Sequence, residues 1–503
     1  MVPRSQRLRG TRLFVRFETY WSPCRVNRTK CGFCISAIVL VMTIEEMRAE
    51  VFRHKKAFGE TVTTWGDRTW VDYYTQDFPY LREPSSAILD IIEKEAGAIL
   101  GGETGARARS AVQKKKWVSS SDHHGLLCHP YFYSSNIAQS DSRVRNGEDT
   151  LVVLPFGNIS LSNDSFPRGF FFHNAESGLE RFLFKSLKER SMPVHALAPL
   201  SRELFLKECD RMRQVPLAAS SRERLFSLLD TFARDARIWS QETYSAQLTA
   251  MNHTLWHTLF GHERGELVYL EIDSVVRRLL LDTHMREETA IQKLLCAPEW
   301  REAFVELFAG VPGSHTATSG THFFWYVDRV RGMRRALRAQ GNVLETDERD
   351  VVIELSPTAL SLALEKRILV PSSALILLVV HAEEGLSCAG GLSQLDYLPL
   401  MMRKWGTLLK RFGGTGMSSS ETGIFAGDQV LCGIENTEGM QAHASLFDIL
   451  LYADTPHALV HEALETTQIQ DTIDAMIPTL HWFVTRMRPE TMPATRLSSK
   501  LFL

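Results

Sequence analysis

The sequence has few cysteines, and they are not arranged as a disulfide framework. Its eight cysteines are spread over 503 residues, whereas small secreted domains hold closely spaced cysteines that pair with one another. The N-terminal apolar run Ala37–Val41 is far shorter than the roughly 20 residues needed to span a bilayer. These features predict reduced thiols, a cytoplasmic location and no membrane partner.

The sequence also lacks an excess of charge of either sign. The 57 basic and 59 acidic side chains give a net charge of −2, so no overall field attracts nucleic acid or an anionic membrane. Hydrophobic residues make up 44% and charged residues 23% of the chain, as in ordinary globular proteins. At roughly 150 residues per domain, the length predicts two to four structural units.

Several motifs that carry known chemistry are missing. No G-x-S-x-G elbow and no G-x-G-x-x-G turn is present. The glycine-rich run Gly413-Gly414-Thr415-Gly416 lacks the Lys-Ser/Thr ending of a phosphate-binding loop. His253 and His257 have helical spacing, but Thr254 stands where a zinc protease has its catalytic Glu. The motifs therefore leave the cofactor unassigned and give no metal site of these types.

The segment before Met42 shows no clear structural pattern. Thr43 followed by Glu46 has the spacing of a capping box, which marks the beginning of a helix. We therefore expect residues 1–41 to be a disordered leader or a spurious extension, and the fold to begin near Met42.

Strands and helices alternate along residues 42–218, which is typical of β-α-β units and a parallel sheet. The expected strands of this first α/β part are Trp117–Ser119, Thr150–Phe156 and Phe170–His173. Residues 43–60, 85–100, 130–139, 176–190 and 200–213 are expected to be helical, and the aromatic-rich residues 65–78 irregular or a short strand.

Residues 219–310 carry apolar spacing near 3.6 and predict a mainly helical insertion. Residues 311–503 predict a second α/β part with a helical C-terminus over 436–490. The predicted fold class is therefore α/β, with a Rossmann-like parallel sheet as its core.

A dense polar cluster follows the first predicted strand. Asp122, His123, His124 and His129 lie within eight residues, at a strand-to-helix junction of the kind where α/β proteins bind ligands. Imidazoles act as general bases near neutral pH or as metal ligands. One hypothesis makes His123 or His124 a base or electrophile oriented by Asp122, with His129 as a substrate-binding residue. The alternative is a metal-dependent hydrolase with these four residues as ligands, since the string resembles the signature of the DHH phosphoesterases.

A second polar loop, residues 157–169, follows the next strand. Its amide, hydroxyl and guanidinium groups suit a polar or anionic ligand. The predicted substrate-binding residues of this loop are Asn158, Ser160, Asn163 and Arg168, with Arg168 holding an anionic group. The same residue types also favour ordinary turns, so a loop without a binding role stays an alternative.

Two distant stretches together resemble the bacillithiol synthase family, which adds cysteine to a glucosamine-malate sugar. The first runs from His124 to Pro130, and the second joins Ile368–Ser373 to the run Gly390-Gly391-Leu392-Ser393-Gln394-Leu395-Asp396-Tyr397. The family has a Gln-Gln turn where this chain has Asp122-His123-His124. The resemblance implies a Rossmann-like fold, a ligase-like or transferase-like enzyme and a small-molecule pocket near His124 and Gly390. It adds Gly390, Gly391, Gln394 and Tyr397 to the predicted substrate-binding residues.

The sequence therefore favours an enzyme or binder that acts on a small polar or anionic metabolite, with no nucleic-acid partner. A non-catalytic ligand-binding or scaffold protein, in which these polar groups serve structure, is the remaining alternative.

Overall fold

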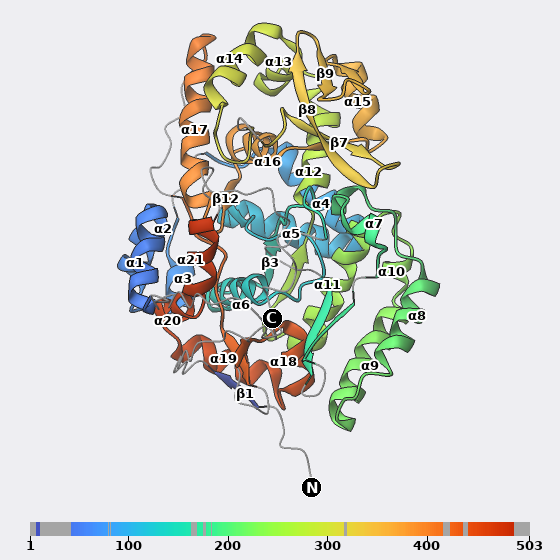
Figure 1. The fold of residues 1–503 in the computed structure, drawn as a ribbon, viewed down its shortest axis with the longest axis vertical. Coiled ribbons are helices and arrows are strands. Elements are labelled where there is room, and N and C mark those ends of the chain that lie inside the picture. The colour runs from blue at the N-terminus through green and yellow to red at the C-terminus, as the bar shows by residue number, and fades with distance from the viewer. Residues whose placement is uncertain are drawn as a thin grey trace, which may run out of the picture.

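The computed structural model is a mixed α/β protein built around a short parallel sheet (Figure 1). It describes residues 7–10, 42–78, 80, 82–161, 169–174, 178–182, 184–315, 319–415, 423–435 and 441–486. Within these residues, no helix has both the length and the apolar character needed to cross a membrane.

The central sheet has four strands, all parallel. In spatial order they are β12 (Ser387–Ala389), β2 (Trp117–Ser119), β3 (Thr150–Val153) and β6 (Glu266–Tyr269). Nearly all of their residues are buried, as expected for a parallel sheet that is covered on both faces. The strands predicted at 117–119 and 150–156 are confirmed, although the second ends at Val153.

Helices cover both faces of this sheet, and side chains alternate between them. Leu151, Val153 and Leu267 belong to one apolar cluster, which includes residues of α6 (Pro130–Arg145) and α11 (Tyr244–Phe260). Val152 and Val268 belong to the other cluster, with α4 (Ser86–Leu100), α5 (Gly102–Lys115) and α12 (Ile272–Leu279). Because successive side chains of a strand point to opposite faces, each central strand contributes side chains to both apolar clusters.

A long excursion separates β3 from β6. It contains an antiparallel hairpin and a series of helices: β4 (Phe170–Asn174), β5 (Gly178–Phe182), α7 (Leu187–Arg190), the 3₁₀ turn Val194–Ala196, α8 (Arg202–Met212), α9 (Ala219–Arg234), α10 (Ala236–Trp239) and α11.

Two expectations for this excursion were wrong. The strand predicted at 170–173 exists, but it pairs only with β5 and lies outside the parallel sheet. Residues 176–190, expected to be helical, contain β5 and only the one-turn helix α7. The apolar residues of β4 and β5 pack as a hairpin because each strand finds its partner a few residues away.

The mainly helical range 219–310 also supplies a strand of the central sheet. Strand β6 lies inside it and pairs with β3 along its whole length, from Thr150↔Glu266 to Val153↔Tyr269. The range is therefore not an insertion set apart from the sheet. A four-residue strand is too short to show a period of its own between long helices.

A second sheet lies near the top of Figure 1 and is entirely antiparallel. Its order is β10 (Val352–Glu354), β9 (Val343–Thr346), β8 (Met333–Gln340), β7 (Phe324–Asp328) and β11 (Leu369–Pro371). The helical elements of this part of the chain are the π turn Leu280–His284, α13 (Ala290–Cys296), α14 (Pro298–Phe308), α15 (Pro357–Glu365), α16 (Ser373–Leu377), the π turn Leu378–Glu383 and α17 (Gln394–Arg411). The second α/β part thus has an antiparallel sheet, while β12 returns to the central one.

The N-terminal helices pack against the C-terminal ones. They are α1 (Ile44–His54), α2 (Lys56–Trp65) and α3 (Trp70–Thr75), against α20 (Ile469–Asp474) and α21 (Ile477–Arg486). The capping box at Thr43 is confirmed. The helix predicted over 43–60 is broken at Lys55 into α1 and α2. Residues 70–75 are helical rather than irregular, because Thr69 and Asp72 form a second capping box.

The C-terminal region is helical with one strand pair. Strand β13 (Cys432–Glu435) pairs with β14 (Gln441–His443), and α18 (Leu446–Tyr452) and α19 (Pro456–Thr466) follow. Residues 436–490 are therefore not helical throughout, since β14 lies within them. Arg7–Gly10 forms strand β1 against β13, so this piece of the expected leader contacts the fold. The other residues before Met42 lie outside the described ones.

Candidate functional site

The polar segments identified in the sequence follow the carboxyl ends of the parallel strands. Asp122 and His123 follow β2, and the backbone of this segment continues to pair with the end of β3. The His124 amide donates to the Phe156 carbonyl at 2.8 Å, and the Phe156 amide donates to the Asp122 carbonyl at 2.8 Å. The two loops are therefore held side by side at one edge of the sheet.

The chain leaves β2 and β12 in opposite directions. From β2 it passes through α6 to β3, on one side. From β12 it passes through α17 to residues 424–426, which pair with Gly390 on the other side: the Gly390 amide donates to the Ile424 carbonyl and the Ala426 amide to the Gly390 carbonyl, both at 2.9 Å. Such a reversal opens a crevice at the carboxyl edge, where α/β proteins bind ligands.

A cavity of about 290 Å³ lies at this crevice. Residues from both neighbouring strand ends line it, together with side chains from β3's loop, α6, α16 and α21. They are Ser120, Ser121, His123, Tyr131, Phe156, Ile159, Ser373, Gly391, Leu392, Ser393, Gln394, Tyr397, Asp428, Thr479, Leu480, Trp482 and Phe483. The lining combines aromatic walls with hydroxyl, amide, imidazole and carboxyl groups.

The turn after β12 forms one wall of the cavity. The Gln394 side-chain amide donates to Ser120 Oγ at 3.1 Å, and this hydroxyl donates to the Ala389 carbonyl at 3.1 Å. At Gly391, an added Cβ would lie 2.6 Å from Asp428 Oδ2. Glycine at this position therefore lets the Asp428 carboxyl approach the turn, and Gln394 links the two strand ends.

The two neighbouring histidines lie in different places. His123 lines the cavity and its ring contacts Phe132, with 5.7 Å between centroids. The side chain of His124 is fully buried, its Nε2 lies 3.0 Å from the Ser245 carbonyl oxygen of α11, and its ring stacks on Tyr269. The structure thus places His123 at the crevice and His124 inside the core.

Asp122 lies beneath the cavity rather than in its lining. Its carboxylate accepts hydrogen bonds from Ser121 Oγ at 3.0 Å, Asn136 Nδ2 at 2.9 Å and the Tyr269 hydroxyl at 3.0 Å. Burial raises the pKa of Asp122 to about 6, although these hydrogen bonds oppose the shift. The bonds from Asn136 and Tyr269 tie the β2 loop to α6 and β6, and the third bond lets Asp122 position Ser121.

The remaining predicted residues of the two loops contact other parts of the protein where the structure describes them. His129 caps α6, because its Nδ1 accepts from the Tyr131 amide at 3.3 Å. Asn158 is buried, and its Nδ2 donates to the Pro371 carbonyl and to Ser373 Oγ, both at 3.2 Å. Ser160 forms a bridge with Pro193. Asn163 and Arg168 lie outside the described residues.

A buried acidic pair explains why the β3 loop begins with glycine. Asp273 Oδ2 accepts from the amides of Gly157 and Asn158, at 2.6 and 3.1 Å. Glu271 Oε2 lies 2.8 Å from His195 Nδ1 and accepts from Ser274 Oγ at 2.7 Å. An added Cβ at Gly157 would meet the Glu271 carboxylate at far less than contact distance. The beginning of α12 thus fixes the path of the β3 loop.

The side chains of the Asp-His-His cluster do not converge to form a metal site. Among the residues that the structure describes, no three His, Cys, Asp or Glu side chains converge in a way that could hold a metal ion. Asp122, His124 and His129 each face a different partner. The arrangement therefore offers no support to the metal-dependent hydrolase hypothesis.

Two parts of the cavity lining were missed by sequence reasoning. Asp428 follows Gly427 in a left-handed conformation, with φ of 51°, and Oδ2 of its carboxylate accepts from the Leu392 amide at 2.6 Å. Trp482 and Phe483 come from α21, far along the chain from the Gly-Gly turn. A Gly-Asp pair is a common turn signal, and nothing local in the sequence connects either segment with the β2 loop.

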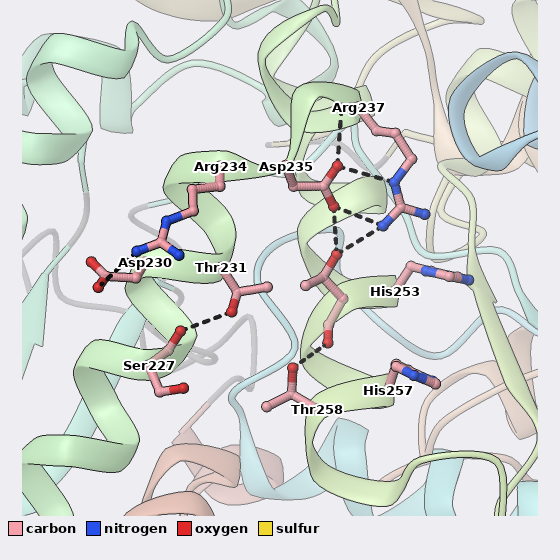
Figure 2. A pocket seen from close by; sticks show the side chains of 10 residues that line it. Ser227, Asp230, Thr231, Arg234, Asp235, Arg237, His253, His257 and Thr258 are labelled. Carbon is pink, nitrogen blue, oxygen red and sulfur yellow. Dashed lines mark hydrogen bonds and ion pairs between the residues drawn. The ribbon is translucent and has the colours of Figure 1, made fainter.

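A second cavity, of about 660 Å³, lies between α9 and α11 (Figure 2). Its charged groups are paired with one another: Arg237 with Asp235 at 2.7 Å, and Arg234 with Asp230 at 3.7 Å. His253 and His257 extend from the same side of α11 in Figure 2, and His253 Nε2 lies 3.1 Å from Glu266 Oε1. These contacts favour helix packing over ligand binding in this groove.

The crevice between β12 and β2 therefore has the features of a small-molecule site, namely enclosure, aromatic walls and a few polar groups. No protein-family model matches the chain, and no curated protein gives a significant match to it.

Proposed function

We propose that this chain is an enzyme that binds a small polar metabolite in the crevice between β12 and β2. The observation that carries the proposal is the cavity of about 290 Å³ at the point where the strand connections reverse direction. In open α/β sheets this point is the usual ligand site, whatever the chemistry performed there.

His123 is the proposed general base or electrophile. It is the histidine that faces the cavity, and an imidazole exchanges protons near neutral pH. Ser120, Ser121 and Gln394 supply hydroxyl and amide groups that orient a polar ligand. Asp122 acts indirectly by holding Ser121.

The resemblance to bacillithiol synthase also favours an enzyme with a small-molecule pocket at this place. The resemblance was found in His124–Pro130 and in Ile368–Ser373 with Gly390–Tyr397, and Gly391, Gln394 and Tyr397 all line the cavity. On this proposal the four-stranded parallel sheet is the remnant of a Rossmann-like core, and the reaction is of a ligase or transferase type. The binding of an anionic group by Arg168 stays a prediction.

A thermal-shift screen of sugars, amino acids and nucleotides tests the proposal. A ligand that binds only the native state raises the melting temperature as its concentration increases above the dissociation constant. We expect at least one metabolite to stabilise the wild-type chain, and Gln394→Leu, which removes the amide and keeps a side chain of similar size, to lose that stabilisation.

Gln139→Leu is a matched control, because Gln139 is also buried but lies on α6 outside the cavity lining. This variant should keep the ligand response. A ligand that stabilises the Gln394→Leu chain as strongly as wild type would show that the crevice is not its site. Turnover of the stabilising metabolite then separates an enzyme from a non-catalytic binder.

A further inference from the structure

One carboxylate lines the cavity. Among the described residues that line it, Asp428 is the single acidic side chain, and none is a lysine or an arginine. His123 is the lining's imidazole, and the phenols of Tyr131 and Tyr397 stay neutral because burial raises their pKa values. Asp428 is therefore the group that gives this lining a negative charge.

Asp428 has one oxygen engaged and one available. Its Oδ2 accepts from the Leu392 amide at 2.6 Å, and Oδ1 has no hydrogen-bond partner among the described residues. The side chain faces the cavity although the residue is only 8% exposed. A buried carboxylate without a counter-ion is costly, so an arrangement of this kind favours a cation beside it.

The cation whose charge acts on Asp428 is already paired elsewhere. Lys55, at the junction of α1 and α2, lies 3.3 Å from Asp396 Oδ2 and is not part of the cavity lining. Burial raises the pKa of Asp428, and Lys55 only partly opposes this effect. Among the described residues, no Lys, Arg or His nitrogen forms an ion pair with Asp428 within 4.0 Å.

Aromatic rings form much of the remaining wall. Tyr131, Phe156 and Tyr397 come from the body of the protein, and Trp482 and Phe483 come from α21. The faces of such rings attract cations as well as apolar groups. A carboxylate in a cavity lined by aromatic side chains is a chemical pattern that recognises a protonated amine.

We infer that the crevice takes a ligand that bears an ammonium group, which pairs with Asp428 while the aromatic walls hold the adjoining carbon skeleton. This inference rests on the proposed function and names the ligand class of the same site. The Asp428 backbone supports the role, since its left-handed conformation aims the carboxylate at the turn after β12. Gly391 lacks a side chain where the carboxylate passes.

Three probes with the same ring and different end groups test the inference: 2-phenylethylamine, 2-phenylethanol and phenylacetate. Their dissociation constants are measured by ligand-observed NMR with the full chain. We expect the amine to bind at least about ten-fold more tightly than the alcohol, as a charge-assisted contact requires, and phenylacetate to bind most weakly.

Asp428→Asn should remove this preference. Asparagine tolerates the left-handed backbone and keeps an oxygen for the Leu392 amide, so the fold is retained while the charge is lost. We expect the amine to bind about ten-fold more weakly to this variant and the alcohol to be unaffected. Asp471→Asn is the matched control, because it removes the same charge from an exposed position on α20, and it should bind all three probes like wild type.

The inference is overturned if wild type binds the three probes equally, prefers phenylacetate or binds none of them, or if Asp428→Asn keeps the amine preference. If Asp428→Asn does not fold, the order of the wild-type affinities for the three probes decides the inference on its own. The proposed function is judged separately, by the response of Gln394→Leu to the metabolite screen, and it stands if a neutral or anionic metabolite is bound there.

Discussion

Two adjacent histidines at the end of β2 lie in different surroundings. His123 and His124 follow β2, where successive side chains point to opposite sides. His123 reaches the cavity, and His124 enters the core between α11 and Tyr269. The composition of the cluster predicts a site at this junction, but the choice between the two rings depends on the register of the β2–β3 pairing.

Replacing each histidine by alanine should separate the two roles. His124→Ala removes a buried ring and leaves the Ser245 carbonyl without its partner, so we expect a loss of about 2–3 kcal/mol in the free energy of unfolding. His123→Ala should cost about 1 kcal/mol or less, but it should abolish turnover and weaken ligand stabilisation. Urea unfolding with and without the stabilising metabolite measures both effects. If His124→Ala loses the stabilisation by ligand and His123→Ala keeps it, the assignment of His123 as the residue that faces the ligand is wrong.

The titration of Asp122 makes the free energy of unfolding depend on pH. Burial raises the pKa of Asp122 to about 6 in the folded chain, compared with about 3.9 when unfolded. The folded state therefore binds the proton more tightly, and the resulting stability is full below pH about 4 and is lost as the pH rises through about 6. A shift of roughly two units corresponds to about 3 kcal/mol at most.

Asp122→Asn should remove this titration. The variant keeps one side-chain oxygen as an acceptor but replaces the other with an NH2 group that cannot accept a hydrogen bond, so it should be less stable than wild type at pH about 4. Between pH about 4 and about 7 we expect the stability gap between wild type and variant to narrow by up to about 3 kcal/mol. Chemical denaturation at several pH values measures the gap, and groups common to both chains cancel. A gap that does not change with pH would contradict the assignment.

At the scale of elements, the turn between β12 and α17 is a part of the site where an added side chain has no space. Gly391→Ala would place a Cβ 2.6 Å from Asp428 Oδ2, which must then move and weaken its bond to the Leu392 amide. We expect a loss of about 1–3 kcal/mol and a marked loss of ligand affinity.

Gly102→Ala provides the matched control for that substitution. Gly102 begins α5, has open space where a Cβ would lie and has no positive φ. Alanine is the better helix former, so this variant should be unchanged or stabilised by up to about 1 kcal/mol. Thermal unfolding and ligand titration of both variants make the comparison. Equal behaviour of the two would show that the turn after β12 is not a close-packed part of the site.

The elements that form the site were only partly predictable. The prediction of β3 follows from a valine- and leucine-rich run bounded by turns, and the structure confirms this strand and the short one predicted at Trp117–Ser119. The other two strands of the sheet, β6 with four residues and β12 with three, were not predicted. Their membership in the sheet is decided by pairing with residues far away in the sequence, as in Thr150↔Glu266 and Trp117↔Ser387.

The same limit applies to the lining residues. Gly391, Gln394 and Tyr397 were predicted through a resemblance, and the structure brings them to one cavity with His123. Asp428, Trp482 and Phe483 were missed, because they arrive from segments whose local sequence signals only a turn and a helix. Long-range packing, rather than a local pattern, determines their place.

At the scale of the whole molecule, helices from opposite ends of the chain meet beside the cavity. Helix α1 packs along α21, and Arg48 forms an ion pair with Asp474 at 2.9 Å. The Trp70 indole donates to Thr472 Oγ1 at 2.8 Å from α3 to α20. These contacts hold α21, which lies beside α1 in Figure 1, and its Trp482 and Phe483 line the cavity.

A crystal structure of the chain with its stabilising metabolite tests the central claim most directly. We expect the metabolite to lie between the β2 and β12 loops, within hydrogen-bond distance of His123 or Gln394 and against the rings of α21. A metabolite bound in the groove between α9 and α11, or elsewhere on the chain with the crevice empty, would contradict the account.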